Sequence, residues 1–221
     1  MTSQRLLKSL VIHEVYASIQ GESSFVGLPC TFVRLSACNL RCRWCDTPQA
    51  FTGGQRIPLP DLLERIATFG TPLVLVTGGE PLLQPDTPAL LTALCDSGYR
   101  VLLETSGERD IAGLDPRVHR IVDFKAPGSG EHARNLLSNI TALTDADEVK
   151  LVLADEADYD WARTFIAEHH LDRRVRHVLL SPVHGELDPQ ALVRWVLRDR
   201  LPVRVQVQVH KYIWGAETQG V

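Results

Sequence analysis

Three of the five cysteines of this chain lie within a stretch of eight residues. They are Cys38, Cys42 and Cys45, in the sequence CNLRCRWC. A structural zinc site takes four ligands and a disulfide framework takes an even number of cysteines, so a group of three suits neither. Iron–sulfur clusters are held by cysteine thiolates, and a cluster of four irons usually takes four. Three thiolates would leave one iron with an open position, where a small molecule can bind.

Two simpler interpretations of the cysteines stay open at this point. The three thiols could hold zinc together with a distant histidine or aspartate. Alternatively, structural thiols could lie close together by coincidence.

A second candidate ligand site follows the apolar run Leu73–Val76. It is the stretch Thr77-Gly78-Gly79-Glu80-Pro81. Glycines allow the backbone to approach a ligand closely, and a carboxylate such as Glu80 can accept hydrogen bonds from an ammonium group. The stretch alone is equally typical of a plain turn, but its position after a strand and its combination with the cysteines favour a binding site.

Composition and charge are those of an ordinary globular protein. Of the 221 residues, 44% are hydrophobic and 23% are charged, and the net charge is −4. The charge gives no reason to expect a nucleic-acid or membrane partner. We find neither a long apolar segment nor the pattern of a secretory leader, and with an odd cysteine count this predicts a cytoplasmic protein. The length predicts one domain, residues 1–221.

Short apolar runs alternate with amphipathic stretches along the chain. We expect buried strands at 31–35, 73–76, 101–103, 121–122, 149–153 and 178–180, and helices at 62–69, 87–97, 158–170 and 189–199. The alternating stretch 203–209 predicts one more strand, with one wet face.

This alternation of strands and helices is typical of a parallel sheet covered by helices on its outside. A complete eightfold β/α barrel needs about 250 residues. The chain is shorter, and its first 30 and last 20 residues look like additions, so we predict an incomplete, open β/α barrel. Sites in such barrels collect at the carboxyl ends of the strands, where we expect the polar residues to converge.

The cysteine spacing, with Trp44 before the last cysteine, resembles the signature of radical S-adenosylmethionine enzymes, and the Gly-Gly-Glu-Pro stretch resembles their second motif. The resemblance implies a 4Fe–4S cluster held by the three cysteines. It also implies that S-adenosylmethionine binds the open iron and yields a 5′-deoxyadenosyl radical, which takes a hydrogen atom from the substrate. The implied cofactor contacts are Trp44, Cys45, Asp46, Gly78, Gly79, Glu80, Glu104, Lys125 and Ser181.

A wider ordered set of motifs is similar to the 7-carboxy-7-deazaguanine synthase family over residues 11–213. It comprises Ile19-Gln20-Gly21-Glu22, Phe32-Val33-Arg34-Leu35, Asp46-Thr47 after the cysteines, Glu104-Thr105-Ser106-Gly107 and His210-Lys211-Tyr212. The implied activity is that of a radical carbon–nitrogen lyase. It contracts the ring of 6-carboxy-5,6,7,8-tetrahydropterin to 7-carboxy-7-deazaguanine, with loss of ammonia, in queuosine precursor synthesis.

The resemblance also implies how the substrate is held. The implied substrate contacts are Ile19, Gln20, Gly21, Glu22, Arg34, Thr77 and His210, and the hydroxyl of Thr47 is implied to bind Mg²⁺. Glutamate suits paired N–H donors of a pterin, and a guanidinium suits its carboxylate. The resemblance names no side chain as a catalytic acid or base.

This chain departs from the family pattern at several positions. It has Asp123-Phe124-Lys125 where Ser-Pro-Lys is common, Ser181-Pro182 where Gln-Pro is common, and Ser23 in place of a glycine. Its tail also continues beyond Tyr212, past the point where some members end and place their terminal carboxylate on the substrate.

Partners follow from the same resemblance, which implies a flavodoxin or ferredoxin as electron donor and a homodimer. Two other functions stay open. One is an activating enzyme for a glycyl-radical protein, which would use the same cluster but lack the pterin-binding carboxylate. The other is a non-catalytic iron–sulfur or zinc module, which would leave the open iron and Thr77–Glu80 without a role.

Overall fold

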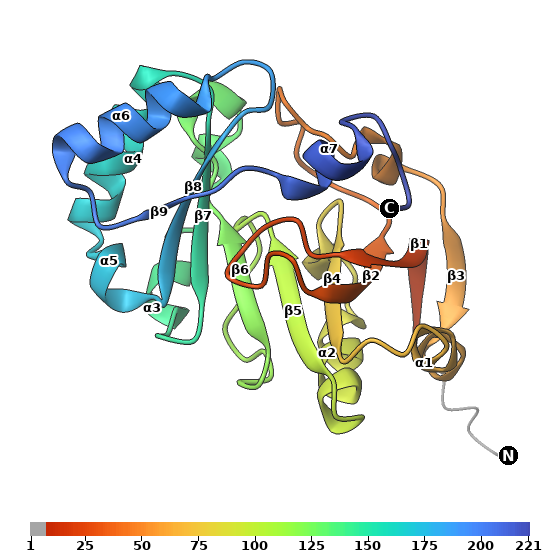
Figure 1. Cartoon of the computed structure of the whole chain (residues 1–221). Helices are drawn as coiled ribbons and strands as arrows, with labels where there is room; N and C mark the ends of the chain where they lie inside the picture. The colour runs from red at the N-terminus through yellow and green to blue at the C-terminus, as the bar shows by residue number, and fades with distance from the viewer. Residues whose placement is uncertain (1–7) are drawn as a thin grey trace, which may run out of the picture.

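The computed structural model describes residues 8–221, which form one strongly curved sheet with helices along its outer side (Figure 1). Its nine strands lie in the order β3 (Gln55–Pro58), β1 (Ser9–Ile19), β2 (Pro29–Leu35), β4 (Leu73–Gly78), β5 (Arg100–Thr105), β6 (His119–Asp123), β7 (Glu148–Leu153), β8 (His177–Pro182) and β9 (Arg204–Val205). Neighbours from β2 to β9 pair in parallel, whereas β1 is antiparallel to both β2 and β3. Because β3 and β9 remain edges, the barrel is open, as predicted.

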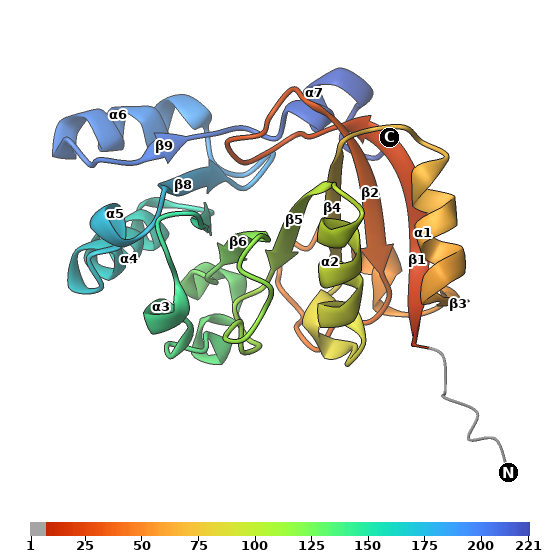
Figure 2. The ribbon, with the colours of Figure 1, turned by 90° about the horizontal axis from the view of Figure 1, so that it is seen from below.

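The helices cover the outer face of the sheet (Figure 2). The longer ones are α1 (Leu59–Ala67), α2 (Thr87–Asp96), α4 (Glu156–Glu168) and α6 (Pro189–Asp199), and they confirm the four predicted helices. The short ones are α3 (Asn139–Ala142), α5 (Leu171–Arg174) and α7 (Val209–Trp214), with 3₁₀ turns at η1 (Pro48–Phe51), η2 (Pro81–Leu83), η3 (Pro127–Ser129) and η4 (His132–Arg134). None of the helices in residues 8–221 has the length and apolar content needed to cross a lipid bilayer.

Alternation along the strands separates an apolar outer face from an inner face that carries both apolar and polar side chains. On β4, Val74 and Val76 pack outward against α1 and α2, while Leu75 points inward beneath Thr77. The side-chain period of two explains this separation, because successive residues of a strand face opposite sides. Each central strand can therefore stabilise the core with one set of residues and present polar groups with the other.

The prediction of a strand over 203–209 was wrong beyond its first residues. Only Arg204–Val205 pair with β8, and α7 begins at Val209. The intervening polar side chains turn inward instead of facing water. Gln206 donates to the Ser181 hydroxyl at 3.0 Å, and Gln208 donates to the Glu22 carboxylate at 2.8 Å. A strand with one wet face would turn both glutamine side chains toward water. The hydrogen bonds to Ser181 and Glu22 override this pattern.

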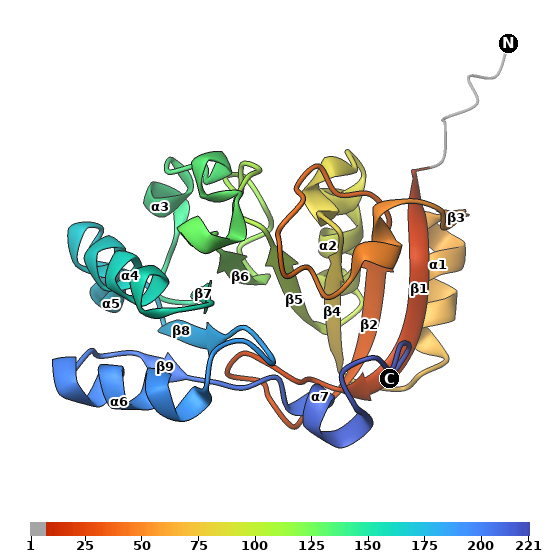
Figure 3. The same ribbon diagram turned by 90° about the horizontal axis from the view of Figure 1, so that it is seen from above.

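The first 30 residues, expected to be an addition, supply β1 and the loop that follows it. This loop, residues 20–28, is called the bridging loop below, and it reaches from β1 and β2 toward β9 and α7 (Figures 2 and 3). The Ser24 amide donates to the Glu148 carboxylate at 3.2 Å, and the Ser23 amide donates to Gln206 at 2.8 Å. The loop thus connects the two sides of a sheet that does not close through strand pairing.

Glu148 is fully buried at the start of β7 and has His119 beside it at 3.5 Å. We predict that Glu148→Ala lowers the free energy of unfolding by about 1.5–3 kcal/mol, because the Ser24 amide loses a charged acceptor. Chemical denaturation monitored by circular dichroism measures the loss.

Two further variants separate this contact from a general effect of losing a carboxylate. Glu148→Gln keeps an acceptor for Ser24 and should lose less stability, and Glu64→Ala removes an exposed glutamate of α1 and should lose almost none. Equal losses in Glu148→Ala and Glu64→Ala would contradict the role assigned to the bridging contact.

Candidate functional site

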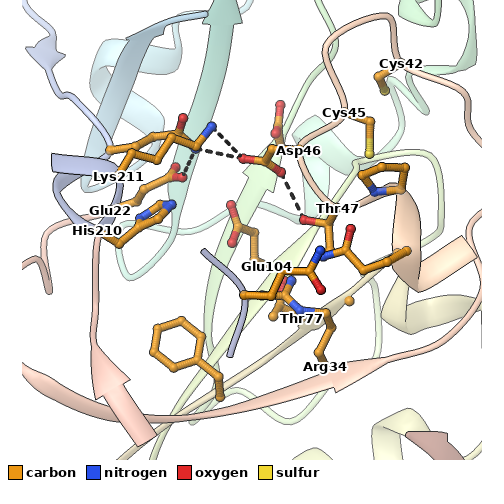
Figure 4. Close-up of a pocket in the computed structure, with 18 of the residues that line it drawn as sticks. Glu22, Arg34, Cys42, Cys45, Asp46, Thr47, Thr77, Glu104, His210 and Lys211 are labelled. Atoms are coloured by element: carbon orange, nitrogen blue, oxygen red, sulfur yellow. Dashed lines mark hydrogen bonds and ion pairs between the residues drawn. The ribbon is translucent and has the colours of Figure 1, made fainter. Parts of the chain in front are cut away.

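A cavity of about 600 Å³ lies inside the curved sheet, at the carboxyl ends of its strands (Figure 4). Inward-facing positions of five neighbouring parallel strands line it: Arg34 on β2, Thr77 on β4, Glu104 on β5, Asp123 on β6 and Lys150 on β7. Because parallel strands end at one edge, residues far apart in the sequence meet here. This confirms the predicted convergence of polar residues at that edge.

The three clustered cysteines line one side of the cavity. All of the cysteines are free, and Cys38, Cys42 and Cys45 are partly exposed. No group of three histidine, cysteine, aspartate or glutamate side chains within residues 8–221 is arranged to hold a single metal ion. Three partly exposed thiols that line open space suit an iron–sulfur cluster, which cysteine thiolates hold.

The glycine motif packs directly against the cysteine loop. The Gly79 amide donates to the Leu35 carbonyl and the Glu80 amide donates to the Ala37 carbonyl. A Cβ atom added to Gly79 would lie 2.2 Å from the Ala37 carbonyl oxygen and 2.7 Å from Cys38 Cβ. Only glycine fits at this position, so the two motifs form one continuous wall with exposed backbone.

Most of the residues predicted from the sequence line this cavity. They are Ile19, Gln20, Glu22, Arg34, Cys38, Cys42, Trp44, Cys45, Asp46, Thr47, Thr77, Gly78, Gly79, Glu104, Lys125 and His210.

Three predicted residues do not line the cavity. The Glu80 side chain is fully buried and accepts hydrogen bonds from the Thr105 hydroxyl at 2.8 Å and the Ser106 amide at 2.7 Å, so it ties the glycine motif to β5. Ser181 accepts from Gln206 behind the cavity wall. Gly21 lies directly behind His210, because an added Cβ would come within 2.1 Å of its Nδ1.

Arg34 has partners in the protein itself. Its Nε donates to Glu14 at 2.6 Å and one terminal nitrogen donates to the Tyr16 hydroxyl at 3.0 Å, both from β1. The antiparallel register, which places Glu14 opposite Arg34, brings these groups together. Among residues 8–221 its other terminal nitrogen, Nη1, makes no hydrogen bond, which leaves donors for a ligand in the cavity.

A polar network joins the cysteine loop to the last helix (Figure 4). The Lys211 ammonium lies 3.1 Å from Asp46, and the Thr47 hydroxyl donates to the same carboxylate at 3.0 Å. His210 faces the cavity beside this network, and burial lowers its pKa. His210 is therefore neutral near pH 7, with one nitrogen free to accept a hydrogen bond.

Several cavity residues were not predicted from the sequence. Lys150 is the most buried charged residue of them, and its only sequence signal is a charge inside the apolar run 149–153. Gln208 was hidden in the presumed strand, whereas Lys211 had been expected at the mouth of the barrel, directly after that strand. The chain beyond α7 also turns back, so that residues 216–221 line the cavity.

Comparison with known proteins identifies relatives of this chain. Residues 33–124 match the Radical SAM superfamily. The chain is 49% identical to 7-carboxy-7-deazaguanine synthase of Chlorobaculum tepidum, over 96% of this chain and 97% of the relative. It is 46% identical to the protein of the same name from Koribacter versatilis, over 95% and 99% of the two chains.

A solved structure has the same fold. The crystal structure of QueE from Escherichia coli aligns with a TM-score of 0.75 over 90% of this chain and 94% of that chain. The sequence identity is 23%, so this likeness supports the fold alone.

The radical S-adenosylmethionine superfamily uses a 4Fe–4S cluster, and the three thiols are the residues that fit it. We predict that anaerobic reconstitution loads wild-type protein with about four irons per chain and that Cys42→Ser loads far less, because one of three thiolate ligands is lost. Iron and sulfide analysis with visible absorption spectra measures this.

Cys95→Ser is the matched control, since Cys95 lies outside the cavity, on α2, and packs against the apolar core on the outer side of the sheet. It should load iron like the wild type. Full loading of Cys42→Ser would contradict the assignment of Cys42 as a ligand.

Proposed function

Because this chain belongs to the 7-carboxy-7-deazaguanine synthase family of radical S-adenosylmethionine enzymes, we propose that its cavity converts 6-carboxy-5,6,7,8-tetrahydropterin to 7-carboxy-7-deazaguanine with loss of ammonia. The observation that carries the proposal is one cavity that is lined both by three thiols and by Gln20, Glu22 and Arg34. Bound there, the cluster and S-adenosylmethionine supply hydrogen-atom abstraction. The residues of the chain bind and orient the substrate.

Glu22 and Gln20 would bind the nitrogen-rich edge of the pterin. Both lie on the bridging loop at the base of the cavity, and Gln20 is 4% exposed. The side-chain oxygen of Gln20, Oε1, accepts a hydrogen bond from the backbone amide of Glu22 at 3.3 Å, which fixes the loop locally. A carboxylate can accept two adjacent N–H groups at once, and the pterin presents such a pair.

Arg34 would bind the substrate carboxylate from the opposite side. Glu14 and Tyr16 hold its guanidinium in one orientation, and the donors that remain face the cavity. A guanidinium fixed in this way pairs with a carboxylate at little further cost in conformational entropy. Thr77 and neutral His210 complete the set of substrate contacts proposed here.

The adenosine and methionine parts of the cofactor would lie along the continuous wall made by the two motifs. We assign Trp44, Cys45, Asp46, Gly78, Gly79, Glu104 and Lys125 to this role because they line the same cavity as the three thiols. Glu80 and Ser181 would act indirectly in this assignment, by holding neighbouring elements in place.

We also propose that the Thr47 hydroxyl binds Mg²⁺ together with the substrate carboxylate. Thr47 lines the cavity directly after the last cysteine. Magnesium takes oxygen ligands and commonly few of them from protein, which a single hydroxyl satisfies.

Two protein partners complete the proposal. A flavodoxin or ferredoxin would supply the electron to the cluster, whose cysteines are partly exposed. A homodimer is supported by the exposed apolar side chains of α7, where Tyr212 is 92% exposed and Ile213 and Trp214 are about half exposed. Such a cluster of large apolar groups is typical of a contact surface.

An anaerobic turnover assay tests the reaction. Reconstituted, reduced protein receives S-adenosylmethionine and the pterin, and mass spectrometry follows the products. We expect 7-carboxy-7-deazaguanine from the wild type, no product from Cys42→Ala, and a rate at low substrate that is about tenfold to a hundredfold lower in Glu22→Ala, because charged hydrogen bonds to the pterin are lost.

Uncoupled cleavage of S-adenosylmethionine without consumption of the pterin would contradict the assignment of the pterin as the substrate. It would favour the alternative function of activating a glycyl-radical protein.

The Mg²⁺ proposal predicts a specific defect in Thr47→Ala. The variant should require a higher Mg²⁺ concentration for half-maximal turnover, because one oxygen ligand is missing. Thr47→Ser retains the hydroxyl and serves as the matched control. A common Mg²⁺ dependence in wild type, Thr47→Ala and Thr47→Ser would exclude Thr47 as a ligand.

A further inference from the structure

Lys150 is a buried cation in the wall of the cavity. It lies on the inner face of β7, and its side chain is 8% exposed. Lysine side chains are almost never buried to this extent without partners. Val152, the next inward residue of the same strand, is apolar.

Three carboxylates from three different elements surround the Lys150 ammonium. Glu22 of the bridging loop lies at 2.9 Å, Asp123 of β6 lies at 3.6 Å, and Glu104 of β5 accepts a hydrogen bond from it. Asp123 has a second cation, Lys125, at 3.0 Å. Lys150 is therefore the cation that Glu22 and Glu104 share.

Glu22 is held from two sides. Its Oε2 accepts from Lys150, and its Oε1 accepts from the Gln208 amide at 2.8 Å. A carboxylate has about four lone-pair sites, so each oxygen keeps acceptor capacity for a ligand in the cavity. The two contacts fix the plane of the carboxylate without consuming its ability to accept hydrogen bonds.

The electrostatics of the two glutamates differ. Burial, the largest single influence, raises the pKa of Glu22, but the charge of Lys150 and the hydrogen bonds from Lys150 and Gln208 together lower the pKa overall. For Glu104, burial is the larger influence and the pKa is raised despite Lys150. Lys150 thus keeps Glu22 in the charged form, which can only accept hydrogen bonds.

We propose that Lys150 is a positioning residue for substrate recognition: together with Gln208, it holds the Glu22 carboxylate so that its free lone pairs meet the paired N–H donors of the pterin. The inference rests on the proposed function and adds a residue that acts through Glu22. Lys150 also prevents Glu22 and Glu104, two carboxylates facing one cavity, from repelling each other when the site is empty.

The test measures pterin affinity apart from turnover. Equilibrium dialysis of the anaerobic, reconstituted but unreduced protein with 6-carboxytetrahydropterin and S-adenosylmethionine gives the dissociation constant. We expect Lys150→Met to weaken pterin binding about tenfold or more, because Glu22 loses its charged partner, and Lys150→Arg to recover most of the affinity.

A double-mutant cycle separates this role from a structural one. Glu22→Gln should weaken binding on its own, and adding Lys150→Met should weaken it little further, because both changes remove the same recognition contact. In the turnover assay, Lys150→Met should raise KM more than it lowers kcat. Iron content confirms that each variant carries the cluster.

Lys150→Met leaves two facing carboxylates and could for that reason fail to fold. Lys150→Met/Glu104→Gln keeps the net charge of the wild type and removes this repulsion, and it should still bind the pterin weakly. Wild-type affinity in either Lys150→Met variant, or fully additive losses in the cycle, would overturn the proposal. If the wild type itself neither binds nor converts the pterin, the proposed function fails instead.

Discussion

The ion pair between Lys150 and Glu22 joins two parts of the sheet that do not pair with each other directly. The sheet begins with β3 and ends with β9, and these two edges do not meet. Lys150 lies on β7, whereas Glu22 lies on the bridging loop between β1 and β2. An open sheet of this size can vary in curvature, so contacts across its inner side decide the shape of its cavity. The bridging loop supplies these contacts, through Ser23, Ser24 and Glu22.

The bridging loop also closes the lower end of the barrel with apolar packing. Phe25 packs against a small inner cluster that includes Phe32, Leu75 and Leu102. The centroid of its ring lies 4.9 Å from that of the His119 ring. Above this layer the same inward-facing strand positions become polar. The inner face is therefore apolar where the barrel must be sealed and charged where a polar ligand would enter. A sealed base also keeps bulk water from the ion pairs above it, which strengthens them.

The chemistry of the site depends on how three segments share one cavity. The cysteine loop and the glycine motif form a rigid wall, because Gly79 packs so closely on Ala37 and Cys38 that no side chain fits between them. The bridging loop forms the base, and α7 with the segment after it covers the side. Hydrogen-atom abstraction requires the reacting groups to be held close together and in one orientation. A wall and a base fixed by backbone contacts meet this requirement better than flexible loops would.

Much of the fold and of the site could be predicted from the sequence, because several of the signals are local. The strands from 31–35 to 178–180 and the four longer helices follow from period, length and capping residues; Asp188, for example, caps α6 by accepting a hydrogen bond from the Gln190 amide. The three cysteines and Thr77–Glu80 indicate the cluster and its cofactor, because they resemble the two signature motifs of the radical S-adenosylmethionine superfamily. The wide set of motifs at 19–22, 34, 47 and 210 indicated the family.

Only the tertiary structure decided which polar groups face one another. Glu80 lies in a predicted ligand motif, yet hydrogen bonds from three donors within the protein occupy its carboxylate. The stretch 203–209 alternates like a strand, yet Gln206 and Gln208 bind partners about 25 and 186 residues away in the sequence. Lys150 had only the weak signal of a charge in an apolar run, because its three carboxylate partners lie on separate elements. Sequence patterns report a residue's own periodicity and neighbours, whereas a buried charge is stabilised by partners that the folded chain alone brings within a few ångströms.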